Sequence, residues 1–355
     1  MHNEIIIFYP YPHAFGGVEN IIVNLSKYKK VKLVCFNNKI TFSNFSKNKN
    51  IKIIELFPKN YFEKFIKLSF FFKNNKTNFM PIMWGAKSTF FALFAGIKKY
   101  AVHIDDPPSL IRSFYEKKNF INSIRFHLIE FLNKIGVNKA SFRITTTKRN
   151  AIECSKYYNC KFKFKYPGID FKNKIINKSK KKIYILSISR IEFNKNIEWI
   201  INSLIYFKKK KFNFFDKLET NILGAGSDMT KIKQLILDNN LNKNVVMRGF
   251  VSEKKKIKYL KKSHISVIPS FQGYGIPALE ALSFQNRLVL NKESRISEIF
   301  LNNQAISITQ NNFISFRNNL KKQIMKSMNY NKNKFEVNLP DHKEWVNYLI
   351  SNCRI

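Results

Sequence analysis

Cysteine is scarce in this chain, and the few cysteines present exclude two classes of scaffold. None forms a C-x-x-C pair, and none has histidines nearby at the spacing of metal ligands. Neither a zinc site nor a disulfide framework is therefore expected. A reducing cytoplasm fits this usage best. The four residues are Cys35, Cys154, Cys160 and Cys353.

Long apolar runs are also missing. The N-terminus carries Glu4 where a signal peptide carries positive charge, and its apolar run ends after five residues, so export by that route is not expected. The most apolar later stretch, 79–97, is interrupted by Pro81, Gly85 and Lys87. It falls short of the roughly 20 apolar residues that span a bilayer. No transmembrane helix is predicted.

Acidic residues are few, and this scarcity leaves a large positive charge. The chain has 63 Lys and Arg against 23 Asp and Glu, a formal net charge of +40. Such a charge indicates either an anionic partner or a coding bias towards lysine. The basic residues are 53 Lys and 10 Arg among many Asn, Ile and Phe, which favours the bias.

The chain is long enough for two domains, and its apolar segments alternate between strand and helix patterns. It has 355 residues, of which 45% are hydrophobic. Strands are expected at 5–8, 31–36, 183–188, 218–223, 244–248, 265–268 and 287–290, and the first helix at 19–28. This alternation predicts an α/β protein with two doubly wound, Rossmann-like domains, 1–170 and 183–340. The Lys-rich segment 171–182 is the expected linker.

The most informative segment runs from Ile265 to Leu282. A β-branched strand ends at Pro269, a glycine loop follows, and Pro277 stands in the first turn of the next helix. Gly273 and Gly275 permit close approach of a ligand, and the N-terminus of the helix favours phosphate. Glu280 is then placed to accept hydrogen bonds from ribose hydroxyls. A tight turn followed by a surface glutamate explains the same residues equally well.

A second candidate element lies upstream. The strand 183–188 runs into Ser189-Arg190-Ile-Glu-Phe-Asn-Lys195, which places two cations after a strand. Arg190 and Lys195 are suited to neutralise a diphosphate as it leaves. Two ordinary surface bases are the alternative.

These segments together resemble a known family. Pro269-Ser270, Gly273-Tyr-Gly-Ile-Pro277 and Leu279-Glu280-Ala281 resemble the signature of retaining GT-B glycosyltransferases of the family 4 type, or glycosyl transferases group 1. The segment from Arg190 to Lys195 resembles the family's G-R-x-x-x-x-K element, with Ser189 for its glycine.

Two further segments, 223–226 and 245–251, resemble landmarks of the same domain in the same order. Gly224 and Gly226 also resemble part of a dinucleotide fingerprint, but Met229 stands where that motif needs a third small residue. An oxidoreductase is rejected on that ground.

The resemblance implies roles for several of these residues. Glu280 would bind the nucleotide ribose, and Gln272, which replaces the first of two family glutamates, would contact the donor sugar without supplying charge. Glu298 resembles a position near the end of the nucleotide site, although an exposed helix glutamate is as good an explanation. Donor contacts would also come from the loop residues Gly273, Tyr274, Gly275 and Ile276.

The N-terminal half resembles the family more loosely. Gly16 and Gly17, in Gly-Gly-Val-Glu, resemble a family loop at the cleft, but a plain turn before a helix is also possible. His103 resembles a histidine that the family places beside the donor sugar. The alternative is that His103 has a structural role. The segment 345–350 resembles a C-terminal helix that packs back on the first domain, so that 341–355 would belong to it.

The expected function is therefore sugar transfer from a nucleotide-sugar to an acceptor hydroxyl of a glycan or lipid-linked glycan. Retention of configuration, front-face attack and a role in bacterial surface polysaccharide (O-antigen, capsule or lipopolysaccharide) are implied by the family. No cofactor and no metal is expected, because Arg190, Lys195 and a helix N-terminus supply positive charge. The alternative is a basic non-catalytic protein, either an inactive relative or a nucleic-acid binder. No recognised nucleic-acid-binding motif occurs, and nucleic acid is not expected as a partner.

One segment bears on location. Residues 61–72 interleave aromatic and basic side chains, as an interfacial membrane helix does. An ordinary core helix rich in phenylalanine fits as well. A Lys-rich first domain would be drawn to anionic lipid, so a cytoplasmic protein with peripheral contact at the inner face of the plasma membrane is expected.

Overall fold

The computed structural model describes residues 4–12, 16–36, 48–115, 120–170, 178–179, 181–300, 303–328 and 335–355. The chain divides into two compact units, one of Met1–Asp170 with Pro340–Ile355 and one of Phe171–Leu339. Most of the expected linker, 171–182, lies outside the described residues. Each unit is an α/β structure with its own parallel sheet, as the alternation of strands and helices predicted.

The sheet of the N-terminal unit has the order β3-β2-β1-β4-β5-β6-β7, and its strands pair in parallel. The chain runs outward through β2 and β3, then returns to the other side of β1. This reversal between β1 and β4 is the topological switch of a doubly wound sheet. The strands are β1 (Ile5–Phe8), β2 (Val31–Cys35), β3 (Ile51–Glu55), β4 (Ile82–Trp84), β5 (Ala101–Ile104), β6 (Phe142–Thr145) and β7 (Lys163–Phe164).

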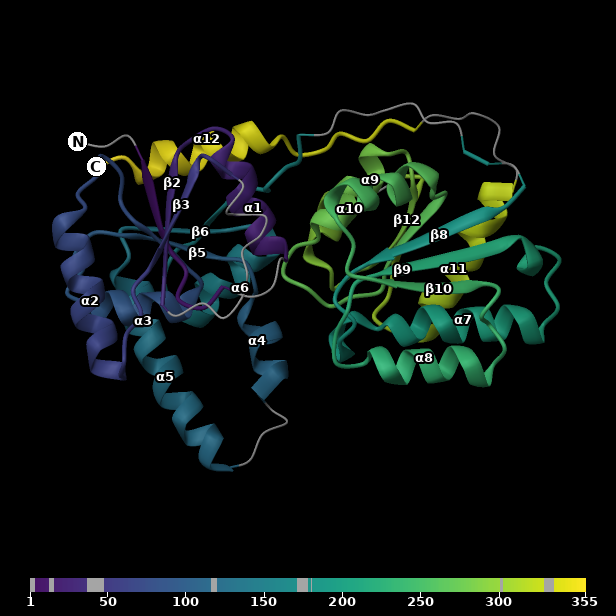
Figure 1. Ribbon diagram of the computed structural model, residues 1–355, viewed down its shortest axis with the longest axis horizontal. Coiled ribbons are helices and arrows are strands. Elements are labelled where there is room, and N and C mark those ends of the chain that lie inside the picture. Colours follow the sequence, from purple (N-terminus) through teal and green to yellow (C-terminus); the bar gives the residue numbers. More distant parts are fainter. Residues whose placement is uncertain are drawn as a thin grey trace. The chain divides into compact units, whose positions relative to one another are not determined.

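Helices cover both faces of this sheet (Figure 1). One face packs against α2, α3, α5 and α6 in a single apolar cluster, and α1 and α12 contact each other. The α12 helix brings the end of the chain back to this unit, as the C-terminal resemblance predicted. The helices are α1 (Gly17–Ser26), α2 (Tyr61–Asn74), α3 (Ala86–Phe94), α4 (Pro108–Tyr115), α5 (Phe120–Lys139), α6 (Lys148–Tyr158) and α12 (His342–Cys353).

The C-terminal unit repeats the topology with the strand order β10-β9-β8-β11-β12-β13, also paired in parallel. The three strands predicted at 183–188, 218–223 and 265–268 have these bounds, and the other two differ by one residue. The strands are β8 (Ile183–Ile188), β9 (Leu218–Leu223), β10 (Val245–Gly249), β11 (Ile265–Ile268), β12 (Arg287–Asn291) and β13 (Ile306–Thr309).

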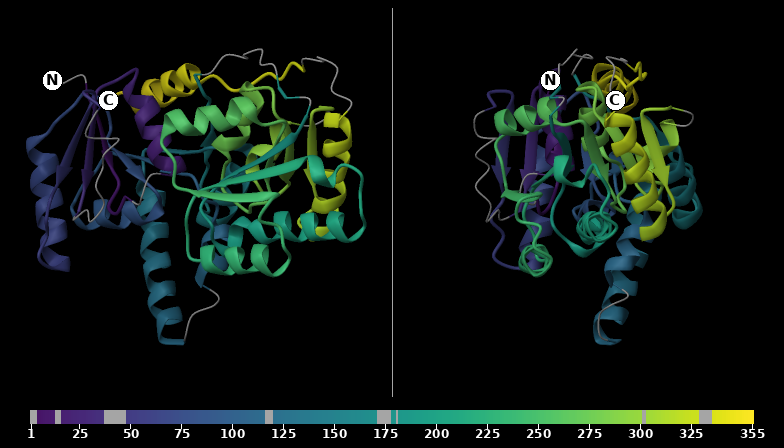
Figure 2. Two further views of the ribbon diagram at one scale, coloured as in Figure 1. Left: turned by 45° about the vertical axis from the view of Figure 1, so that its right-hand side comes forward. Right: turned by 90° about the vertical axis from the view of Figure 1, so that its right-hand side faces the viewer.

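The two faces of the second sheet carry different helices (Figure 1, Figure 2). Apolar side chains of α7, α8 and α11 pack with those of the strands in one large core, while α9 and α10 cover the other face. Because both faces are covered, the central strands β8 and β11 are largely apolar and buried along almost their whole length instead of alternating with exposed polar residues. The helices are α7 (Ile197–Lys209), α8 (Met229–Asp238), α9 (Glu253–Lys262), α10 (Ile276–Ser283) and α11 (Phe313–Met328), with the 3-10 turns η1 (Phe193–Lys195), η2 (Phe215–Lys217) and η3 (Arg295–Ile299).

Candidate functional site

The two predicted motifs of the C-terminal unit follow adjacent strands. β8 and β11 pair directly, and the chain turns outward in opposite directions from them, so they flank the switch point of the sheet. In open α/β sheets, ligands bind at the carboxyl ends of strands at such a point. The segment with Arg190 and Lys195 follows β8, and the glycine loop 270–275 follows β11. Strand order alone therefore brings the two motifs to one place.

Hydrogen bonds join these two loops into one structure. The backbone N–H of Phe271 donates to the carbonyl of Asn194 at 3.0 Å, and the Asn194 amide donates back to the carbonyl of Phe271 at 3.3 Å. The Asn196 side chain donates to the carbonyl of Pro269 at 2.8 Å. The loop after β11 is therefore held by the turn that carries Lys195.

Lys195 and Gln272 are in direct contact. The Lys195 ammonium is buried and lies 3.3 Å from Gln272 Oε1, to which it donates. The amide nitrogen of Gln272 in turn donates to Ser294 Oγ at 3.0 Å. The side chain at 272 is thus positioned from both ends, by a cation on one side and a hydroxyl on the other.

Arg190 differs from Lys195. Its side chain is 56% exposed and pairs with Glu192 at 3.0 Å. The expected pair of cations therefore consists of one buried, positioned ammonium and one guanidinium in solvent. An exposed pair of this kind contributes little to stability, so Arg190 is able to exchange Glu192 for another anion.

The start of α10 is a tightly packed turn. Gly275 has φ +149°, and a Cβ there would lie 2.9 Å from both Ile296 Cγ2 and Ser294 Oγ. Only glycine fits this conformation and this space. Pro277 lies in the first turn of α10, as predicted. The donor-loop residues Gly273, Tyr274, Gly275 and Ile276 are all buried.

Glu280 lies inside the unit. It is 5% exposed, and its Oε1 accepts a hydrogen bond from Lys256 Nζ of α9 at 2.6 Å. The same ammonium lies 3.0 Å from Glu253 Oε1. Burial raises the pKa of Glu280, and the charge of Lys256 opposes this shift only in part. The alternative of a surface glutamate is excluded, while contact with a ribose stays a prediction.

Lys256 was not among the residues singled out from the sequence. It is buried on α9 together with Leu260, one helical turn further on. A lysine at a position of the apolar stripe of a helix is the signal that would have found it.

The remaining predicted site residue of this unit, Glu298, lies half-buried in η3. Residues of η3 and its N-terminal flank, Ile296 and Ser294, pack against Gly275. Glu298 therefore belongs to the element that supports the α10 turn. Its contact with a nucleotide stays a prediction.

Gly224 and Gly226 are explained by the loop after β8. A Cβ on Gly224 would overlap the Ser189 carbonyl oxygen, and one on Gly226 would overlap the Ile191 carbonyl oxygen. The N–H of Ile191 donates to the carbonyl of Ala225 at 3.0 Å. These glycines permit the loop after β9 to pack on the backbone that leads to Lys195, which is a structural role.

In the N-terminal unit, Gly16 and Gly17 form the start of α1. The N–H of Gly16 donates to Glu19 Oε2 at 2.9 Å, which satisfies a backbone donor at the helix start. A Cβ on Gly17 would meet no atom within 4 Å. The plain turn before a helix accounts for what is seen, and a donor contact by either glycine stays a prediction.

His103 is completely buried in the N-terminal unit. Its ring stacks on Trp84 at 4.3 Å between centroids and meets the Trp345 ring edge-on at 5.8 Å. Its Nδ1 lies 3.6 Å from Asp105 Oδ1. The ring is thus enclosed by aromatic side chains in this structure, which matches the structural alternative, and its place beside a donor sugar stays a prediction.

Among the described residues, none of the helices combines the length and the apolar character that a bilayer-spanning segment needs. No group of three or more His, Cys, Asp or Glu side chains in the same residues is placed to hold a metal ion.

Two doubly wound units with parallel sheets match the GT-B fold, and solved structures with that fold align with nearly the whole chain. WaaG, a glycosyltransferase involved in lipopolysaccharide biosynthesis, aligns with a TM-score of 0.69 at 12% identity over 99% of this chain and 94% of its own. Anabaena Alr3699/HepE, solved with UDP and glucose, aligns with a TM-score of 0.71 at 13% identity over 99% and 98%.

A family model matches most of the C-terminal unit. Residues 168–334, just under half of the chain, match the profile of the family described as Glycosyl transferases group 1. MJ1069 of Methanocaldococcus jannaschii, an uncharacterized glycosyltransferase, is 23% identical over 335 residues, which cover 84% of this chain and 83% of the relative.

Proposed function

We propose that the protein transfers a sugar from a nucleotide-sugar to an acceptor hydroxyl with retention of anomeric configuration. The observation that carries the proposal is the junction of the loops after β8 and β11, where Lys195 contacts Gln272 beside the start of α10. A buried ammonium next to a helix N-terminus is suited to a diphosphate. The structure of HepE with UDP and glucose supports a donor of this chemical class.

Each group then has a defined task. Lys195 and the positive end of the α10 dipole bind the diphosphate, and Arg190 leaves Glu192 to add a second cation. Gln272 donates to a hydroxyl of the donor sugar, and Glu280 accepts from the ribose. No metal is assigned a role, because these groups supply the positive charge that a leaving diphosphate requires.

The reaction we propose is front-face substitution at the anomeric carbon. The bond from that carbon to the phosphate oxygen breaks, and a bond to the acceptor oxygen forms on the same face. The departing phosphate takes the acceptor proton, so the products are the glycoside and a nucleoside diphosphate. The contribution of the protein is to stabilise the negative charge that develops on the phosphate.

A binding assay with matched variants tests the donor site. Thermal shifts with UDP, GDP and ADP and their glucose conjugates identify the nucleotide, since a ligand of the folded state raises its stability by about 2.7 kcal/mol at a hundred times Kd. Lys195→Met is expected to weaken that nucleotide about 10-fold to 100-fold, the loss of a charge-assisted hydrogen bond. Lys209→Met, an exposed lysine at the other end of α7, is the control. Unchanged affinity in Lys195→Met would refute the site.

We also propose that α2 contacts an anionic membrane surface, where the protein meets a lipid-linked glycan of bacterial surface polysaccharide assembly. Phe62, Ile66 and Phe70 lie one helical turn apart and are 73%, 52% and 69% exposed. The opposite side of α2 buries Leu68 and Phe71 in the core. The helix therefore serves the core and also presents a separate apolar stripe to solvent.

Basic and apolar groups adjoin this stripe. Ile66 and Phe70 border a groove of about 360 Å³ between α2 and β3, which Lys67 also lines. An apolar stripe beside lysines is typical of interfacial helices on anionic lipid. With vesicles of phosphatidylglycerol, flotation is expected for the wild type and loss of flotation for Ile66→Ser/Phe70→Ser. Leu237→Ser/Ile314→Ser, a pair comparably exposed in the other unit, is the control. Equal flotation of both double variants would refute a role for α2.

A further inference from the structure

The ion pair between Lys256 and Glu280 joins α9 to α10. The Lys256 side chain is 11% exposed and that of Glu280 is 7% exposed, and their charged atoms are 2.6 Å apart. A pair this well buried is costly to desolvate, and removal of one partner leaves an uncompensated charge. Apolar residues of the same size would hold the two helices together at least as well. The pair therefore calls for an explanation other than packing.

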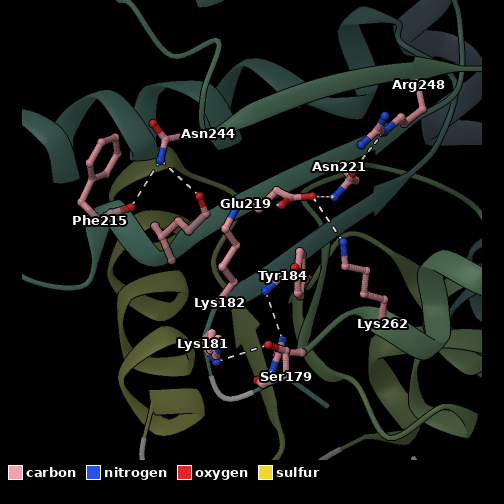
Figure 3. A network of polar contacts seen from close by, with 12 residues as sticks. Ser179, Lys181, Lys182, Tyr184, Phe215, Glu219, Asn221, Asn244, Arg248 and Lys262 are labelled. Carbon is pink, nitrogen blue, oxygen red and sulfur yellow. Dashed lines mark hydrogen bonds and ion pairs between the residues drawn. The ribbon is translucent and has the colours of Figure 1, made fainter. Parts of the chain in front are cut away.

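The helix that carries Lys256 is anchored to the sheet by several polar contacts. Lys262, in its last turn, lies 3.6 Å from Glu219 Oε1 and 3.8 Å from the centre of the Tyr184 ring. Glu219 also accepts from Asn221, and Asn221 accepts from Arg248, as Figure 3 shows. The last turn of α9 therefore contacts β8 and β9 through Lys262, and the network continues to β10.

Arg248 extends this network back to the middle of α9. Its guanidinium lies 5.5 Å from the centre of the Tyr259 ring, three residues after Lys256. The helix that carries Lys256 therefore contacts the sheet near its centre and at its end, while Glu280 and Glu253 contact the ammonium itself. A fixed cation is what a carboxylate needs if its orientation and charge are to be constant.

We propose that Lys256 is a positioning residue for nucleotide binding, which keeps Glu280 ionised and oriented to accept hydrogen bonds from the two ribose hydroxyls. The inference rests on the proposed function. A carboxylate has about four acceptor positions, so the bond to Lys256 leaves others for the ribose diol. A protonated Glu280 would instead offer one donor, and buried ribose hydroxyls would be left without a charged acceptor.

The balance of charge and burial supports this role. Burial raises the pKa of Glu280, while the neighbouring ammonium lowers it. Burial alone would lower the pKa of Lys256, but Glu280 and Glu253 raise it overall, so the ammonium keeps its charge. Without Lys256, the pKa of Glu280 would rise further. On acidification, ribose binding would then be lost at a higher pH than in the wild type.

The test compares a ribonucleotide with its 2′-deoxy counterpart. The nucleoside diphosphate with the largest thermal shift among UDP, GDP and ADP, and the 2′-deoxy form of that nucleotide, are titrated calorimetrically from about pH 5 to about pH 9. The wild type is expected to prefer the ribo form, with a preference that falls at acidic pH. Lys256→Met is expected to lose about tenfold or more of this preference at neutral pH and to shift its pH midpoint upward.

Matched variants separate positioning from folding. Lys255→Met removes an exposed lysine of the same helix and is expected to keep the preference and its midpoint. Lys256→Arg retains the charge and is expected to restore most of the preference. If Lys256→Met fails to fold, Lys256→Gln provides the test, because it keeps a donor without a charge. The midpoint should again move upward.

Two kinds of failure can be distinguished. A wild type that binds none of the nucleotides overturns the proposed function and this inference with it. The other failure concerns Lys256 alone. If the wild type prefers the ribo form, and Lys256→Met or Lys256→Gln leaves the size and the pH midpoint of that preference unchanged, the role of Lys256 is overturned.

Discussion

Gly224→Ala is expected to destabilise the C-terminal unit strongly, because the new methyl group has no space. Gly224 has φ +136°, and its Cβ would overlap the Ser189 carbonyl oxygen and lie 2.9 Å from the Ser189 carbonyl carbon. Both obstacles are backbone atoms, which cannot rotate away as a side chain does. The two loops would have to separate.

The cost can be worked from the contacts that hold these loops together. Ser189 donates to the carbonyl of Leu223 at 3.1 Å, and Ile191 donates to the carbonyl of Ala225 at 3.0 Å. Each backbone hydrogen bond contributes about 0.5–1.5 kcal/mol net, and an unfavourable backbone conformation costs about 1–3 kcal/mol. We expect the free energy of unfolding of this unit to fall by about 3–5 kcal/mol. For a domain of this size, the melting temperature would fall by about 10 °C.

Gly249→Ala is the matched control. Gly249 also has a positive φ, +65°, but a Cβ there would meet nothing within 4 Å. Gly249→Ala should therefore lower the free energy of unfolding only by the cost of the left-handed backbone conformation, about 1–2 kcal/mol. Calorimetric melting of both variants checks the difference. Equal shifts in the two would refute the argument that the close approach of Ser189 requires a glycine at 224.

Three shorter predictions follow from the other contacts. Burial lowers the pKa of His264 to about 4, so the free energy of unfolding should fall by about 3 kcal/mol as the pH falls from about 6.5 to about 4. In calorimetry, His264→Asn should flatten this pH dependence while keeping an acceptor for the N–H of Tyr184. Trp345→Ala should cost about 3–5 kcal/mol in melting experiments, because this ring is fully buried, while Lys343→Ala on the exposed side of α12 should be neutral. In Gln272→Glu the new carboxylate should pair with Lys195, so calorimetry should show weaker binding of the free nucleoside diphosphate. Tighter binding would contradict the assignment of Lys195 to the phosphates.

The C-terminal sheet was predictable because its strands carry an unambiguous pattern. Short β-branched runs such as 265–268 are bounded by loop residues and separated by helical stretches, and they are found where expected. The N-terminal unit was harder. β4 has three residues, between Pro81 and Gly85, and a run so short has no periodicity to read. Its neighbours in space come from distant parts of the chain, β1 and β5, which no local pattern indicates.

The candidate site was predictable to the level of its loops but not of its contacts. Strand order brings the segment with Lys195 to the loop with Gln272, and spacing indicated both. Burial could not be foreseen. Glu280 faces a lysine of another helix, and His103 lies between two tryptophans, one of them from the far end of the chain. Such environments depend on tertiary packing, which a single sequence does not show.

The two units place different chemistry near the carboxyl ends of their central strands. At the carboxyl ends of β8 and β11, polar side chains hold one another, and Lys195 brings positive charge to the start of a helix. In the other unit, aromatic rings pack together at β4 and β5, beside the switch between β1 and β4, with His103 stacked on Trp84. Rings offer surface for packing but cannot neutralise a diphosphate, whereas a fixed ammonium can. Lys195 and the start of α10 therefore favour the switch point of the C-terminal unit as the place for the diphosphate that we propose.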